Sequence, residues 1–239
     1  MSYRPEYQRE MSTMERLTAT THLSDTQASV IKQTYLLFGV SVFCAMAGGY
    51  IGATSETLAR FFSGWIGWIV AIVALNVIPM VAMAVRHNPF LGVTALVLDG
   101  FIAGIVISPL LFVASLYAPM LILAALAITG MVFLGVTGYV FLSGRTFAAP
   151  RGMMVGIFVS IIGAVVLNSF MNIGWLGILI SAGIGILGVL TLIYSTSGVL
   201  NSPDADSPIP GALALFAGTF NVFVATLNIL LRLMGGGRR

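Results

Sequence analysis

Long apolar runs, each about twenty residues and almost free of charge, recur along most of the chain. They lie at residues 35–53, 62–85, 90–114, 119–142, 152–170, 178–197 and 211–234. An α-helix of about 20 apolar residues crosses the hydrocarbon core of a bilayer. The strands of a membrane barrel would instead alternate apolar and polar residues. The pattern therefore predicts an all-α polytopic membrane protein, a bundle of seven transmembrane helices.

Small residues recur at four-residue spacing on several of these runs. This spacing places them on one helix face, where they let a neighbouring helix approach closely. We therefore expect helix packing at Gly177, Ser181 and Gly185 of the sixth run, Gly152, Gly156 and Ser160 of the fifth, and Gly100, Gly104 and Ser108 of the third. The alternative is that these faces slide during gating. The uncharged sixth run is expected to be the central helix.

The hydrophilic stretch, residues 1–33, differs from everything that follows it. It carries mixed charges at Arg4, Glu6, Arg9, Glu10, Glu15, Arg16 and Asp25. We expect a mobile N-terminal tail here, followed by a transmembrane domain over residues 34–239. Ser24 or Asp25 could cap a helix that continues through Lys32 into the first run.

Composition agrees with a membrane protein. Hydrophobic residues make up 58% of the 239 residues and charged residues only 8%, whereas a soluble domain carries about 25% charged residues. The single cysteine, Cys44, lies in an apolar run, which excludes an intrachain disulfide. The few basic residues are scattered, so we expect no nucleic-acid partner.

The distribution of Lys and Arg predicts the orientation in the membrane. Loops on the cytoplasmic side are enriched in these residues. A cytoplasmic N-terminus puts most of them on that side, namely Arg4, Arg9, Arg16, Lys32, Arg86, Arg145 and Arg151. The basic C-terminus disagrees with a seventh full crossing. The last run is therefore a full crossing, which its length favours, or a re-entrant helix that returns the C-terminus to the cytoplasm.

Asp99 is the only acidic residue inside an apolar run. A carboxyl group at membrane depth is costly and is often functional. We expect a neutral group that hydrogen-bonds between helices. The alternative is a role in passing protons or cations.

Other polar side chains within the runs are candidates for the same pathway. These are Asn76, Asn168, Ser195, Asn221 and Asn228. Asn221 and Asn228 are seven residues apart and so share a helix face. Hydrogen bonding between helices is the favoured interpretation, and a polar pathway through the bundle is the alternative.

Groups for catalysis or metal binding are scarce. His22 and His87 are isolated and lie outside the apolar runs, and Asp204 and Asp206 sit in a proline-flanked loop. Catalytic and structural metal sites need several clustered ligands. We therefore expect no enzyme, no bound cofactor and no metal site, with weak cation binding by the two loop aspartates as the alternative.

Four segments together resemble the Bax-inhibitor-motif family. They are residues 32–37 (KQTYLL), 104–109 (GIVISP), 193–197 (IYSTS) and 215–223 (LFAGTFNVF). The resemblance covers about residues 30–235. It implies a bundle of seven helices with the sixth at its centre, and a place in the inner membrane of a bacterium.

The family also bears on function. In several members, two aspartates on the sixth and seventh helices form a pH-sensitive latch for a calcium leak. The matching positions here are Ser195 and Gly218, which cannot ionise, so the resemblance implies no such latch. The chain is most similar to a bacterial branch that modulates an FtsH-like AAA membrane protease. We therefore expect a protease-binding regulator, with the N-terminal tail as its handle. The alternative is a cation or proton leak channel.

Overall fold

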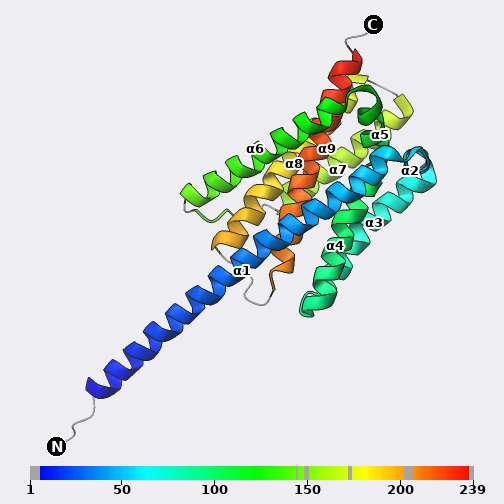
Figure 1. Cartoon of the computed structure of the whole chain (residues 1–239). Coiled ribbons are helices and arrows are strands. Elements are labelled where there is room, and N and C mark those ends of the chain that lie inside the picture. The colour runs from blue at the N-terminus through cyan, green and yellow to red at the C-terminus, as the bar shows by residue number, and fades with distance from the viewer. Residues whose placement is uncertain (1–5, 144, 148–150, 172–173, 202–206, 237–239) are drawn as a thin grey trace, which may run out of the picture.

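Nearly all residues that the computed structural model describes lie in helices. The described residues are 6–143, 145–147, 151–171, 174–201 and 207–236. Figure 1 shows these helices as an elongated bundle. Their bounds are α1 Glu6–Thr54, α2 Glu56–Ser63, α3 Trp65–Ala84, α4 Pro89–Val106, α5 Ser108–Tyr117, α6 Pro119–Ser143, α7 Arg151–Met171, α8 Gly174–Asn201 and α9 Ile209–Gly236.

Six of these helices are long and apolar enough to cross a membrane. They are Gln27–Thr54 within α1, then α3, α4, α6, α8 and Ile209–Gly235 within α9. Helix α7 contributes a shorter apolar stretch, Met154–Val165, among the described residues. Large apolar side chains such as Trp65, Phe90 and Leu142 face outward, as a lipid-facing surface requires. The polytopic helical membrane fold is therefore confirmed. Among the described residues six helices meet these criteria, so the predicted number of seven is not confirmed.

Helix α1 starts much earlier than the sequence indicated. It begins at Glu6 and runs without a break into the first span, so residues 6–33 extend that span as a helix. No Gly or Pro occurs between residues 6 and 38 that could interrupt it. In Figure 1 the N-terminal half of α1 projects well beyond the other helices.

Two connections also differ from the prediction. The segment between the first two apolar runs, which we expected only as a connection, is the short helix α2. Its first turn is capped by the Ser55 hydroxyl, which accepts from the Leu58 amide. The third apolar run is two helices, α4 and α5, with a break at Ile107. Pro109 lies in the first turn of α5, where its missing N–H leaves no helical hydrogen bond unmade.

The closest partner of α1 is α4, and the two helices run parallel. Gly100 lies against Ser41, and four residues later Gly104 lies against Ala45. A Cβ atom on either glycine would overlap a backbone carbonyl oxygen of α1. This parallel contact joins two helices that are not consecutive, because α2 and α3 lie between α1 and α4 along the chain.

Helices α8 and α9 are antiparallel and share the middle of the bundle. The predicted central helix, α8, packs against α1, α6, α7 and α9, and α9 packs against α1, α3, α4, α5, α6 and α8. Their facing residues recur every seven positions, as Val199 with Gly211, Leu192 with Gly218, and Gly185 with Ala225. At each of these positions, a side chain of one helix packs against a glycine of the other helix.

The last apolar run is the unbroken helix α9, 28 residues long. In Figure 1 the first turn of α1 and the last turn of α9 lie at opposite ends of the bundle. An unbroken apolar helix of this length is long enough for a full crossing. The side of the membrane on which the C-terminus lies stays a prediction.

Candidate functional site

The predicted packing face of the sixth run turns toward α9. A Cβ atom on Gly185 would lie 3.2 Å from the Cβ of Ala225, and one on Gly177 would overlap the Arg232 guanidinium. Ser181 is buried and its hydroxyl donates to the Gly177 carbonyl at 2.9 Å. Gly188 and Gly218, which approach even more closely, were not part of the predicted set. Their contact can be recognised only when it is known how α8 and α9 pair.

The predicted packing face of the fifth run lies in a different environment. Gly156 and Ser160 on α7 are exposed. A Cβ atom on Gly156 would meet nothing within 4 Å. Gly152 also belongs to α7, but its surroundings lie outside the described side chains. Gly156 and Ser160 therefore face outward from the bundle instead of making a close contact with another helix.

Asp99 lies on α4 and is only 5% exposed. Its carboxyl makes no hydrogen bond or ion pair with any described residue. The helices that pack on α4 are α1, α3, α5 and α9. The interhelical hydrogen bond expected from the sequence is therefore not formed among the described residues.

The other polar candidates are spread over four helices. The exposed Asn76 on α3 donates to the Ile72 carbonyl at 2.7 Å, and Ser195 on α8 donates to the Thr191 carbonyl at 2.7 Å. Asn228 on α9 accepts from Arg232 Nε at 2.6 Å. Each of these three hydrogen bonds joins two residues of the same helix, so none of them links two helices.

The two remaining asparagines lie on different helices. Asn168 is half-buried on α7, and Asn221 is half-buried on α9 where that helix faces Gly188. The structure therefore does not gather the candidate residues into one polar pathway.

The isolated titratable residues do not assemble either. His87 is exposed and accepts from Arg86 Nε at 3.2 Å. Asp204 and Asp206 fall outside the described residues, as does the side chain of His22. Within the described part of the chain, no group of three or more His, Cys, Asp or Glu residues could hold a metal ion.

A group of hydroxyls in the interior was not anticipated. The Tyr35 hydroxyl of α1 lies beside the hydroxyls of Thr137 on α6 and Thr196 on α8. All three oxygens are buried, and none makes a well-formed hydrogen bond with a described residue. Tyr and Thr are common in apolar runs, so no sequence signal would have found this group.

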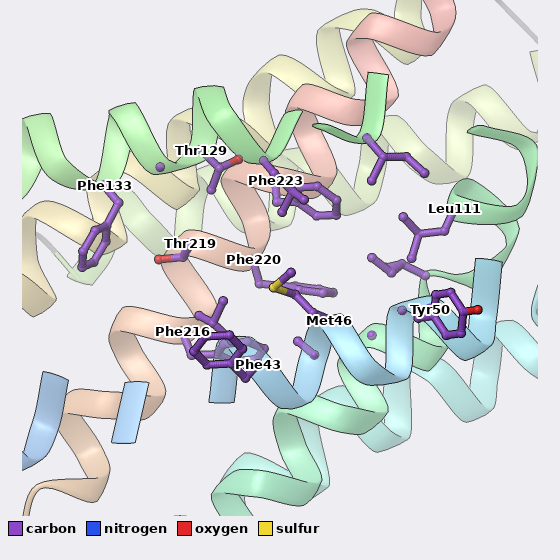
Figure 2. A pocket seen from close by; sticks show the side chains of 18 of the residues that line it. Phe43, Met46, Tyr50, Leu111, Thr129, Phe133, Phe216, Thr219, Phe220 and Phe223 are labelled. Carbon is purple, nitrogen blue, oxygen red and sulfur yellow. The ribbon is translucent and has the colours of Figure 1, made fainter. Parts of the chain in front are cut away.

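A groove lies between α1 and α6. It has a volume of about 540 Å³ and is floored by α9, with α4 and α5 at one side. Figure 2 shows Phe216, Phe220 and Phe223 of α9 pointing into it, with Phe43, Met46 and Tyr50 of α1 and Thr129 and Phe133 of α6 around them. We call this feature the apolar groove. Its lining suits an apolar ligand and offers no reactive group.

This architecture defines a polytopic α-helical membrane protein built around a tightly packed α8–α9 pair. The chain belongs to the Bax inhibitor family: residues 27–237 match the family described as Inhibitor of apoptosis-promoting Bax1. The resemblance drawn from the four sequence segments is thereby confirmed.

Bacterial relatives match most of the chain. An uncharacterised protein of Neisseria meningitidis serogroup A is 33% identical over 216 residues, covering 87% of this chain and 92% of that protein. One of Campylobacter jejuni is 31% identical over 207 residues, covering 84% and 87%. The protein named Modulator of FtsH protease YccA, from Escherichia coli K12, is 27% identical over 223 residues, covering 91% and 97%.

Proposed function

We propose that this chain is a regulator in the bacterial inner membrane that binds an FtsH-like AAA protease and modulates it, and that it is not an enzyme itself. The observation that carries this proposal is the projecting N-terminal half of α1. The first span starts at Gln27, so 21 helical residues, 6–26, precede it. At 1.5 Å per residue they extend about 30 Å beyond the span.

The chemistry of this segment suits a soluble AAA partner. It is hydrophilic and mixed in charge, and it leads directly into a span that packs tightly on α4. With the N-terminus in the cytoplasm, as the distribution of Lys and Arg favours, an ATP-driven unfoldase could grip the segment while the packed bundle resists extraction. The named Escherichia coli relative supports this choice of partner.

The channel alternative has less support. The polar candidates lie on separate helices, Asn76 faces outward, and the positions matching the family latch are Ser195 and Gly218. No described observation favours a second function.

The experiment uses the protease and this protein together in liposomes. Degradation of a fluorescent membrane substrate is measured with the full chain and with a variant lacking residues 1–25. We expect the effect on turnover to vanish in the truncated variant. A variant lacking residues 237–239, at the other end of the chain, is the control and should behave as the full chain does. Equal modulation by the full and the N-terminally truncated chains would refute the proposal.

A further inference from the structure

The apolar groove is accessible from the side of the bundle. Phe43 and Tyr50 of α1 line it and are 72% and 73% exposed. Both residues lie in the membrane span Gln27–Thr54. What reaches the groove from this side is therefore the lipid phase, not water.

The groove is closed at its deep end by two stacked rings. Phe38 of α1 and Phe133 of α6 have ring centroids 4.8 Å apart and nearly parallel planes. Tyr50 lies twelve residues further along α1, which is about 18 Å at 1.5 Å per residue. One leaflet is half of the hydrocarbon core, about 15 Å. The groove is therefore about as deep as one leaflet.

The two threonine hydroxyls in the groove are already bonded. The Thr129 hydroxyl donates to the Ala125 carbonyl at 2.7 Å, and the Thr219 hydroxyl donates to the Leu215 carbonyl at 2.8 Å. A bound group therefore needs no polar atoms along its length.

The shallow end of the groove has interfacial character. Tyr50 is followed by the end of α1 at Thr54 and then by α2, which carries the ion pair Glu56–Arg60. Tyrosine is favoured at the boundary between hydrocarbon and headgroups because its ring is apolar and its hydroxyl is polar. Figure 2 shows the Tyr50 hydroxyl at the edge of the labelled cluster, away from the phenylalanines. A ligand with a polar head therefore has its head at this end.

The volume distinguishes between the two apolar ligands that a membrane offers. A methylene group takes up about as much space as a water molecule, about 30 Å³, so 540 Å³ holds about eighteen methylenes. A transmembrane helix 30 Å long and about 10 Å across occupies on the order of 2,000 Å³. A spanning helix would also have to pass the closed end at Phe38 and Phe133.

From access, depth, polarity and volume, we propose that the apolar groove binds one acyl chain of a membrane phospholipid. The terminal methyl lies against Phe38 and Phe133, and the headgroup lies at the Tyr50 end. The chain fills the space between α1 and α6 and so holds α1 against the bundle. This inference does not depend on the protease partner.

The test measures phospholipid retained by the purified protein. The full chain is extracted in mild detergent and washed. Native mass spectrometry then measures the mass of the protein with any phospholipid that it has retained. We expect one phospholipid per chain. Gly130→Phe places a ring in the groove at a position where a Cβ atom meets nothing within 4 Å. It should retain about tenfold less phospholipid, the change that corresponds to about 1.4 kcal/mol in binding free energy.

Gly135→Phe is the matched control. Gly135 lies on the same helix, is exposed, has equally open surroundings and does not line the groove. Equal retention by the two variants, no phospholipid on the full chain, a free fatty acid in its place or a co-purified membrane protein would each overturn the proposal.

A second measurement uses the unaltered protein and is independent of whether the variants fold. Liposomes contain a phospholipid with a photoreactive group near the end of one acyl chain, and labelled peptides are identified after irradiation. We expect labelling of α6 around Phe133 and of α9 around Phe216 to exceed that of the outward-facing surface of α3. Labelling no stronger there than on α3 would overturn the proposal.

Discussion

A Cβ atom on Gly218 of α9 would lie 2.9 Å from the Cγ atom of Leu192 on α8 and 3.0 Å from its backbone nitrogen. The leucine thus fills the space over the glycine, and the two helix backbones approach closely. The same relationship recurs seven residues on, where Val199 of α8 lies over Gly211 of α9. In a bilayer, where helices gain little from apolar burial, such close packing is a main source of association.

Gly218→Ala should destabilise the bundle. The added methyl meets the backbone of α8, which cannot move aside, and overpacking of this kind costs about 1–3 kcal/mol. The midpoint of unfolding by SDS in mixed micelles measures the change. Gly177→Ala at the same interface is the control, because its methyl meets the end of the flexible Arg232 side chain. Equal midpoints for the two variants would contradict this account of the α8–α9 contact.

Gly104→Ala should destabilise the parallel contact between α1 and α4. Its Cβ atom would overlap the Ala45 carbonyl oxygen and lie 2.6 Å from the Gly49 nitrogen. Because both clashes involve backbone atoms, Ala45→Gly should not restore stability in the double variant. Thermal unfolding of the two single variants and the double variant tests this. Recovery in the double variant would show that side-chain crowding, not backbone approach, limits the contact.

Asp99→Asn should leave the stability almost unchanged. The carboxyl is buried without a described partner, and a neutral carboxyl and an amide of similar shape cost similar amounts to bury. Removing one partner of a buried ion pair would instead cost about 3–5 kcal/mol. The SDS unfolding midpoint distinguishes these cases. A large loss of stability would mean that Asp99 carries a charge and has a partner outside the described contacts.

Asn88→Ala should weaken the start of α4. The Asn88 side-chain oxygen accepts hydrogen bonds from the amides of Phe90 and Leu91, at 3.1 and 3.2 Å. Loss of such a cap costs about 1 kcal/mol. Hydrogen exchange of the first-turn amides of α4 should accelerate in Asn88→Ala. Asn88→Asp retains the accepting oxygen and should exchange these amides as slowly as the unaltered protein does. Equally fast exchange in the two variants would argue against the cap.

Features that depend on local chemistry could be predicted from the sequence. The lengths of the apolar runs and their lack of charge indicate membrane helices because a bilayer excludes unpaired backbone groups. The regular spacing of small residues on one face follows from helix geometry. The helix start predicted at Ser24 or Asp25 is wrong, because both residues lie inside α1, which begins at Glu6. The predicted packing face at Gly177, Ser181 and Gly185 does face α9, whereas the one containing Gly156 and Ser160 faces outward. Spacing places residues on one face and does not say which neighbour that face meets.

By itself, the sequence thus determined the helical membrane fold, the approximate spans and the family. Only the tertiary structure decided that α1 pairs in parallel with α4, that α8 and α9 match every seven residues, and that Asp99 and the asparagines lie apart. It also decided that the Phe38 and Phe133 rings stack between α1 and α6 and that these helices line an apolar groove. These features depend on which helix surfaces meet across long stretches of chain, and that choice is made by packing of whole helices, which no local pattern of residues encodes.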